Sequence, residues 1–337
     1  MARPAPLERR PPRPSAGRPA LLLLGVDGGG TKTRAVVTDG DDRILGEGVA
    51  GPSNPLRVGV AEAAVAVREA AERACAAAGV RRVELAAAEV GLAGVKRADL
   101  RARMREALSG LGPAALEVVT DADIALYGAT GGGPGLAVIA GTGSICCGAN
   151  ARGRRACAGG WGPVAGDEGS GSWIARRGLA AVARATDGRG TRTQLVEAAC
   201  DYFNVTSPED LSLAIYAPNM TNQRIAGFAR HVIEAAQRRD AISRAVLRDA
   251  GRELGLAAAT VVRKLRMQRE RFRVGYVGGV FTAGELILGP LREAVSGVAP
   301  HAELCPPELA PAEAAARMAR SLGRRDGAQH VRLALAG

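Results

Sequence analysis

The stretch LLLLGVDGGGTKTRAVVTD, residues 21–39, decides the fold because it joins two apolar runs through three consecutive glycines. This pattern predicts a β-hairpin with a Gly-rich turn. In most turns of this kind the glycines serve geometry alone, and Asp27 would then be a turn residue. Glycines also let backbone N–H groups close around phosphate oxygens. The second interpretation is therefore a phosphate loop with a carboxylate beside it.

A second stretch repeats this scheme. LAVIAGTGSICCGAN, residues 136–150, is again an apolar strand, a Gly/Thr/Ser turn and an apolar strand. Two such hairpins, each opening an α/β half of the chain, predict two related domains that face one ligand. The first turn is no P-loop, because Thr31 separates Gly30 from Lys32, and no dinucleotide fingerprint, because a strand follows the glycines. A carboxylate beside the β- and γ-phosphates is where Mg²⁺ needs an oxygen ligand, which gives Asp27 a function.

The rest of the chain alternates short β-like runs with helical periodicity. This pattern indicates an α/β protein whose long helices are concentrated in its second half. Strands are predicted at residues 21–27, 33–39, 43–50, 86–92, 115–120, 136–141, 144–149 and 274–278. Helices are predicted near residues 60–79, 97–109, 122–129, 168–186, 192–203, 222–239, 241–268, 284–296 and 311–321.

The composition argues against several functions. With 337 residues, of which 47% are apolar, the chain is long enough for about two globular domains. Its net charge of +11 is accompanied by only 3% aromatic residues and by no basic block in the folded region, so we expect no nucleic-acid partner. No stretch approaches the roughly 20 apolar residues of a membrane span, so we expect no membrane association.

The amino terminus and the cysteines indicate a cytoplasmic protein. Residues 1–20 are rich in Arg and Pro, which predicts a disordered tail. A signal peptide is the alternative, but the short apolar run after it leads straight into Asp27 with no small-residue cleavage site. The cysteines show no metal-ligand spacing. We expect reduced core thiols at positions 75, 146, 147, 157, 200 and 305.

Three motifs carry a family resemblance. GVDGGGTKT, AGTGS and above all GGWGPVAGDEGSGSWIARRGL at residues 159–179 resemble the BadF/BadG/BcrA/BcrD ATPase family, and within it the N-acetylglucosamine kinase branch. The resemblance implies the α/β fold of the actin, hexokinase and heat-shock chaperone superfamily, with two RNase H-like domains and a central ATP cleft. The domains so expected are residues 21–130 and 131–309, after the tail at 1–20, with a helix near 310–322 completing the first.

The resemblance also implies the nucleotide-binding residues. The two glycine turns match the family's phosphate loops, with ATP and Mg²⁺ as cofactors and with Asp27 holding the metal through water. VGYVGGVF, residues 274–281, resembles the adenosine motif, although a GG pair is also common at strand-to-helix turns. The residues implied are Asp27, Gly28, Gly29, Gly30, Thr31, Lys32, Gly141, Thr142, Gly143, Ser144, Gly278 and Gly279.

Asp121 matches the position of the family's catalytic base. It ends the run LEVVTD and stands at the start of a predicted helix. From the residues alone a helix cap is an equal alternative, because Asp is well suited to that position. The implied reaction is in-line phosphoryl transfer, in which Asp121 orients a primary hydroxyl and accepts its proton. The product would be a sugar 6-phosphate.

The substrate-binding residues implied by the resemblance are Asn54, Gly94, Trp161, Gly162 and Asp167. Asn54 stands before a proline, which is also ordinary turn chemistry. Trp161 would form a wall of the sugar pocket unless it is a buried structural residue, and Asp167 would accept hydrogen bonds from ring hydroxyls. Ala93 and Ile145 replace polar residues of the animal enzymes. The sugar therefore stays open among N-acetylglucosamine, glucosamine and N-acetylmuramic acid.

A second function comes from the same family. Some members are ATPases that drive electrons into radical dehydratases and reductases, and they hold an iron–sulfur cluster at a dimer interface through cysteines. Cys146 and Cys147 follow the second glycine turn, but adjacent cysteines are awkward ligands and the GWG…GDEG segment has no evident use in such an ATPase. The expected partners are thus a small sugar and ATP, and a homodimer is the common outcome in the family.

Overall fold

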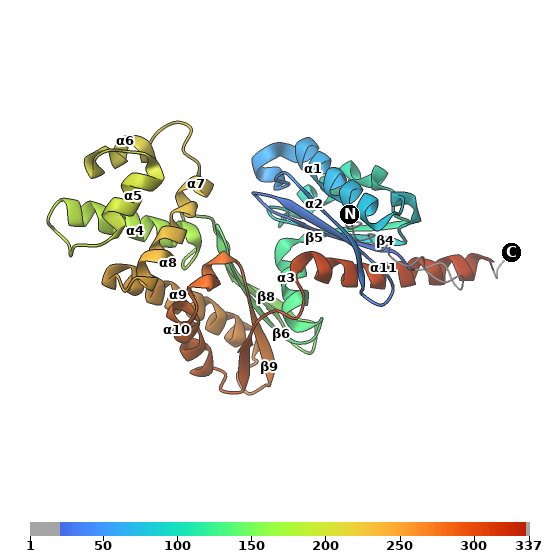
Figure 1. Cartoon of the computed structure of the whole chain (residues 1–337). Coiled ribbons are helices and arrows are strands. Elements are labelled where there is room, and N and C mark those ends of the chain that lie inside the picture. Colours follow the sequence, from blue (N-terminus) through green and yellow to red (C-terminus); the bar gives the residue numbers. More distant parts are fainter. Residues whose placement is uncertain (1–20, 335–337) are drawn as a thin grey trace, which may run out of the picture. The chain divides into compact units, whose positions relative to one another are not determined.

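The computed structural model describes residues 21–334 and divides them into two compact units (Figure 1). The first unit contains residues 21–90, 97–118 and 315–334, and the second contains residues 91–96 and 119–314. The segment predicted to be a disordered tail, residues 1–20, lies outside the described residues. No helix among the described residues is long and apolar enough to cross a membrane.

The first unit is built on a five-stranded sheet in the order β3-β2-β1-β4-β5. β1 and β2 form the antiparallel hairpin expected from the first glycine turn, with Asp27 opposite Arg34 and Gly28 opposite Thr33. β2 pairs antiparallel with β3 in turn. The strands are β1 (Leu23–Gly28), β2 (Thr33–Thr38), β3 (Ile44–Ala50), β4 (Ala87–Leu92) and β5 (Ala115–Thr120).

Helix α1 packs closely on this sheet because β3 carries glycines. A Cβ at Gly46 would lie 2.3 Å from the Ala74 carbonyl oxygen of α1, so a larger residue would separate the two elements. The helix begins after Asn54, whose Oδ1 accepts the Leu56 N–H at 3.0 Å, which is the turn chemistry considered above. The elements of this unit are completed by α1 (Pro55–Ala78), η1 (Arg82–Glu84), α2 (Ala98–Ala107), η2 (Ser109–Leu111) and α11 (Pro311–Ala334), of which α11 packs Ala319 against Leu23 and Ala87.

The second unit repeats the strand order of the first, as β8-β7-β6-β9-β10. In each sheet three consecutive strands form an edge and two later strands complete the sheet. β6, β7 and β8 are antiparallel, whereas β9 runs parallel to β6 and β10 runs parallel to β9. The strands are β6 (Gly135–Ala140), β7 (Ser144–Ala149), β8 (Arg155–Gly159), β9 (Phe272–Val277) and β10 (Ala302–Cys305).

Helices cover the second sheet. α3 packs on β6 and β9, α9 packs on β7 and β8, and α10 lies along α9 (Figure 1). The region between β8 and β9 contains helices but no strand, and its apolar side chains form a core that includes the fully buried Phe228. The helices of the second unit are α3 (Asp121–Thr130), α4 (Gly171–Thr186), α5 (Leu195–Phe203), η3 (Pro208–Asp210), α6 (Leu211–Ile215), α7 (Asn222–Gly227), α8 (Ala229–Gln237), α9 (Ala241–Leu265), η4 (Gly279–Ala283) and α10 (Glu285–Ser296).

The structure differs from the predicted elements in a few places. β8 and β10 were not predicted, because both are short and neither carries an apolar run. The helix predicted from residue 168 begins only at Gly171. Asp167 and Gly169 have φ values of 59° and 75°, which a helix does not accept, and the Ser170 side chain caps α4 by accepting the Trp173 N–H.

The division into units also differs from the predicted boundary at residue 130. The chain enters the second unit at Val119, so that α3 belongs to this unit. The reason is packing, since α3 covers β6 and β9. Gly275 on β9 permits the close approach, because a Cβ there would lie 2.4 Å from Ala129 Cβ.

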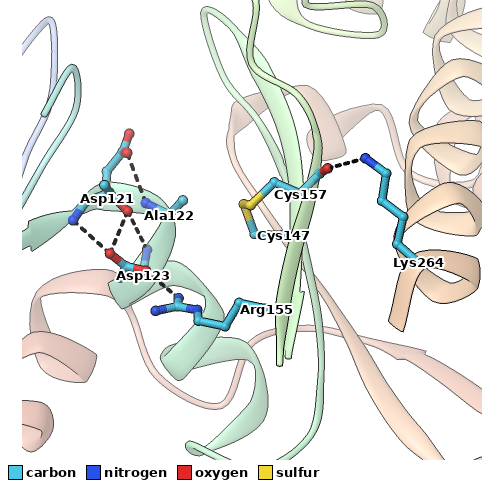
Figure 2. Close-up of a disulfide and its surroundings, with 8 residues drawn as sticks. Asp121, Ala122, Asp123, Cys147, Arg155, Cys157 and Lys264 are labelled. Carbon is cyan, nitrogen blue, oxygen red and sulfur yellow. Dashed lines mark hydrogen bonds and ion pairs between the residues drawn. A yellow bond between two sulfur atoms is a disulfide. The ribbon is translucent and has the colours of Figure 1, made fainter. Parts of the chain in front are cut away.

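The prediction of reduced thiols is wrong for Cys147 and Cys157, which the structure joins as a disulfide (Figure 2). The two residues face each other on β7 and β8, with their Cα atoms 4.2 Å apart. Because β8 was not predicted, nothing in the sequence brought them together. Among the four free cysteines, burial raises the pKa of the Cys146 thiol and also raises the pKa of Cys75, to about 11.

Candidate active site

The first glycine turn joins β1 to β2 and is held by the segment before α1. The Gly29 N–H donates to the Lys32 carbonyl and the Ser53 N–H donates to the Gly29 carbonyl, both at 3.0 Å. The Thr33 hydroxyl donates to the Gly51 carbonyl at 2.7 Å and lies 2.8 Å from the Ser53 Oγ. Backbone and hydroxyl groups therefore fix this turn.

Two charged side chains flank the first turn. Asp27 is the last residue but one of β1 and is partly buried. Arg57, in the first turn of α1, lies over Gly30, where a Cβ would be 3.1 Å from the Arg57 Nη1. A guanidinium beside a Gly-rich turn is suited to phosphate oxygens. Arg57 was not predicted, and its place just after Asn54 at a helix start was the only signal.

The second glycine turn joins β6 to β7 and is tied to the start of α4. The Gly171 N–H donates to the Gly141 carbonyl at 2.8 Å. The Ser172 hydroxyl donates to the Thr142 carbonyl at 2.7 Å. These bonds hold the carbonyl groups of the turn toward α4, an arrangement that suits the use of its N–H groups for an anion.

Asp167 connects this turn to the GWG segment. Its side chain is buried, Oδ1 accepts the Gly162 N–H at 3.2 Å, and a Cβ at Gly143 would lie 2.6 Å from Oδ2. Burial raises the pKa of the Asp167 carboxyl, while hydrogen bonds from the Gly162 and Ser144 N–H groups lower it. The Ser144 hydroxyl, expected to bind phosphate, donates to the Glu168 carbonyl at 2.7 Å. Asp167 and Ser144 thus hold the turn in shape.

Trp161 is not a buried structural residue, since 76% of its surface is exposed. The Lys96 Nζ lies 5.8 Å from the centroid of its ring. Lys96 directly follows the GLAGV segment, in which Gly91 packs against Ile124 of α3. An exposed indole has an apolar face and a polar edge, and both suit contact with a sugar ring.

Asp121 is the first residue of α3, but it is not the cap of that helix (Figure 2). The cap is Thr120, whose Oγ1 accepts the Asp123 N–H at 3.2 Å, while the Asp123 Oδ2 accepts the Thr120 N–H at 3.0 Å. Asp121 Oδ1 accepts the N–H of Ala122 at 2.9 Å. Burial raises the pKa of the Asp121 carboxyl, the Ala122 N–H opposes this, and the neighbouring charge of Asp123 raises the pKa further.

The predicted adenosine motif lies against the second glycine turn. Gly278 has a φ of 125°, and a Cβ there would lie 2.2 Å from the Ala140 carbonyl oxygen and 3.1 Å from the Gly141 nitrogen. Only glycine fits this position. The structure therefore brings the second turn, Asp167 and Gly278 together within the second unit, while the first turn and Asn54 lie within the first.

Carboxylates that could hold a metal are dispersed. In the part of the chain that the structure describes, no three or more His, Cys, Asp or Glu side chains gather into a metal-binding group. Asp27 is the acidic residue of the first turn and Asp167 lies against the second.

Two copies of one five-stranded α/β unit, each opened by a glycine hairpin, define a protein of the actin, hexokinase and heat-shock chaperone class. A model of the BadF/BadG/BcrA/BcrD ATPase family matches residues 24–319, and the chain belongs to this family. Both the predicted fold class and the predicted family are confirmed.

Named relatives agree with the kinase branch. The chain is 36% identical to an N-acetylmuramic acid/N-acetylglucosamine kinase of Clostridium acetobutylicum, over 77% of this chain and 85% of that protein. It is 29% identical to an N-acetyl-D-glucosamine kinase of Dictyostelium discoideum, over 88% and 97% of the two chains. The crystal structure of a proposed N-acetylglucosamine kinase from Chromobacterium violaceum superposes with a TM-score of 0.73 at 30% identity, covering 89% of this chain and 99% of that one.

Proposed function

We propose that this protein transfers the γ-phosphoryl group of ATP to the 6-hydroxyl of an amino sugar such as N-acetylglucosamine, with Asp121 as the base. The observation that carries the proposal is the start of α3. Thr120 and Asp123 cap the helix there, so the Asp121 carboxylate is not needed for capping. Burial raises the pKa of the Asp121 carboxyl, and a raised pKa makes a carboxylate a stronger proton acceptor. The enzyme class, an ATP-dependent phosphotransferase, is confirmed by the named kinases.

The phosphate groups of ATP would be bound at the two glycine turns, residues 27–32 and 141–144, by N–H groups other than those of Gly29, Gly141 and Ser144, which donate to protein acceptors. Arg57 would add a positive charge beside the first turn. Asp27 would hold Mg²⁺ through water, and the ion supplies neutralisation of the phosphate charge. Gly278 would pack this segment against the second turn, and Gly279, where an added Cβ would meet nothing within 4 Å, would leave room for the nucleoside.

The sugar would be bound by the exposed indole of Trp161 and by the backbone at Gly94 and Gly162. Asp167 accepts hydrogen bonds from the Gly162 and Ser144 N–H groups, but a carboxylate has about four lone-pair positions and retains capacity for a ring hydroxyl. Asn54, through its side chain amide, would add a contact from the start of α1. Asp121 would orient the primary hydroxyl and accept its proton as the bond to phosphorus forms.

The setting of the enzyme is part of the proposal. We place it in the cytoplasm, where ATP is available, and expect a homodimer with no nucleic-acid or membrane partner. The near-absence of aromatic residues supports the lack of a nucleic-acid partner, because single strands are bound by stacking on aromatic rings.

The test is a substrate panel with the unmodified protein. ATP consumption with Mg²⁺ is measured with N-acetylglucosamine, glucosamine, N-acetylmuramic acid and glucose, and the product is identified by phosphorus NMR. We expect sugar-dependent turnover that yields a 6-phosphate. ATP hydrolysis that ignores every sugar, accompanied by bound iron after anaerobic purification, would instead favour an electron-transfer ATPase.

A further inference from the structure

A charged cluster lies beside Asp121 and has no part in the reaction described so far. It consists of Thr120, Asp123 and Arg155, of which Asp123 and Arg155 are labelled in Figure 2. The Asp123 Oδ2 accepts hydrogen bonds from the Thr120 N–H at 3.0 Å and from the Thr120 hydroxyl at 2.8 Å. The other carboxylate oxygen, Oδ1, is paired with the Arg155 Nη2. Both oxygens of Asp123 are therefore engaged.

Arg155 is not needed to cap the helix. The capping box of α3 is complete with Thr120 and one oxygen of Asp123. The side chain of Asp123 is only 20% exposed, whereas that of Arg155 is 54% exposed. An ion pair with one largely buried partner is less screened by solvent than a fully exposed pair. The Arg155–Asp123 ion pair is therefore a tertiary contact in addition to the helix cap.

Arg155 extends from a strand that is itself fixed. It is the first residue of β8 and lies opposite Ala149 of β7. Two residues further along, Cys157 is bonded to Cys147, and its carbonyl accepts a hydrogen bond from the Lys264 Nζ at 2.9 Å. Since β7 begins in the second glycine turn, the ion pair connects the start of α3 to the strand pair that carries this turn.

We propose that Arg155 is a positioning residue for phosphoryl transfer: its ion pair with Asp123 fixes the first turn of α3 against β8 and thereby holds the Asp121 carboxylate in place. The inference rests on the proposed function, because it concerns the base of that reaction. Asp121 and Asp123 belong to the same helical turn, so a shift of one moves the other.

Arg155 also offsets the negative charge of Asp123. That charge raises the pKa of Asp121, and a guanidinium on Asp123 opposes the effect. The other elements packed on α3 bring few charges, and β6 brings none. The remaining titratable groups are Tyr127 on α3, Cys146 on β7, Lys96 on the segment that contacts Ile124, and Tyr276 and Arg273 on β9, of which Arg273 pairs with Glu308.

The test compares the pH profiles of Arg155→Met and Asp123→Asn with that of the unmodified enzyme, using sugar 6-phosphate formation. Arg155→Met leaves the negative charge of Asp123 without its Arg155 partner, and this charge then raises the pKa of Asp121 more strongly. The acid limb of kcat should therefore move up by about 0.5 to 1 pH unit. Asp123→Asn removes the neighbouring charge, so the limb should move down. At the optimum, Arg155→Met should lower kcat by roughly 10-fold, with the KM values for ATP and sugar nearly unchanged. The opposite shifts report the charge at Asp123, and the lower kcat at the optimum with unchanged KM values reports the position of the Asp121 carboxylate.

Arg189→Met is the matched control, because it removes one positive charge from a fully exposed pair of the same unit, that of Arg189 with Asp187. It should leave kcat and the acid limb unchanged. Arg155→Lys keeps the charge and should recover most of the loss, and Arg155→Gln replaces the Met variant if circular dichroism shows that the latter does not fold.

The outcomes separate the two hypotheses. An active unmodified enzyme whose kcat and pH profile are shared by Arg155→Met would overturn this inference alone, as would acid limbs that move in the same direction in both variants. No sugar phosphorylation by the unmodified protein would overturn the proposed function and the inference with it.

Discussion

The two glycine turns occupy the same place in two equivalent sheets, yet they are supported differently. The first is held by hydrogen bonds from Ser53 and Thr33, and a Cβ at Gly29 would meet its nearest neighbour at 3.6 Å. The second is packed against Asp167, and a Cβ at Gly143 would lie 2.6 Å from that carboxylate. Gly143 of the second turn is therefore closely packed, whereas Gly29 of the first turn is not.

This difference indicates separate uses for the turns. The first has room for charged groups, with Asp27 and Arg57 beside it. The second turn is held more rigidly, because Asp167 joins it to the GWG segment and Gly278 lies against its first residue. We therefore expect enzyme activity to depend mainly on side-chain size in the second turn and mainly on side-chain charge in the first.

The largest expected effect is that of adding one methyl group to the second turn. Gly143→Ala forces the Asp167 carboxylate away from the Gly162 N–H, so kcat should fall by roughly 100-fold or more. Gly29→Ala, in the first turn, meets only ordinary contact distances within the protein and should lower kcat clearly less than Gly143→Ala does. Steady-state kinetics of both variants provide the comparison, and equal losses would refute the distinction between the turns.

The charge of the first turn is tested by Asp27→Ala. If Asp27 holds Mg²⁺ through water, the variant should need more Mg²⁺ for half-maximal activity and should lose roughly 10- to 100-fold in turnover. Sugar binding, followed by calorimetry, should change little. A Mg²⁺ dependence identical to that of the unmodified enzyme would return Asp27 to the role of a turn residue.

A smaller effect is expected for Trp161→Ala. The indole is 76% exposed, so its removal should leave the melting temperature unchanged. Loss of a stacking surface for the sugar should raise the KM for the sugar by roughly 10-fold, with little change in the KM for ATP. Leu213→Ala, at a side chain 75% exposed in the helical region, is the control and should change neither value. A large drop in stability for Trp161→Ala would argue for a packing role.

The two units also differ in covalent support, since the disulfide joins strands of the second. Thiol titration of the denatured protein should find four free cysteines before reduction and six after it. Reduction should lower the free energy of unfolding by about 2 to 3 kcal/mol, as expected for a short closed loop. Six reactive thiols in the untreated protein would show that the expectation from the sequence was right after all.

The sequence could predict features that depend on neighbouring residues, but not features that depend on contacts between distant segments. Both hairpins could be read directly, because apolar runs and glycines are local, and the repeated pattern led to the duplicated fold. β8 and β10 carry no such pattern, and with β8 unseen the Cys147–Cys157 pairing and the place of Arg155 were hidden as well. Arg57 became visible only when α1 was placed beside the first turn.

The raised pKa of Asp121 also affects the stability of the protein. Burial raises its pKa in the folded protein, so the protonated form favours folding. The corresponding stability is present below the pKa of the unfolded chain and is lost as the pH rises through the folded value. At neutral pH Asp121→Asn should therefore melt at the same temperature as the unmodified protein or at a higher one.

The most direct measurement of the central claim is sugar 6-phosphate formation by Asp121→Asn across pH, with ATP and sugar binding followed separately by calorimetry. The unmodified enzyme should lose activity as the pH falls through the raised pKa of Asp121. The variant should bind both substrates normally, form product roughly 100-fold more slowly or worse, and lack that acid limb. Product formation near the unmodified rate would contradict the assignment of Asp121 as the base.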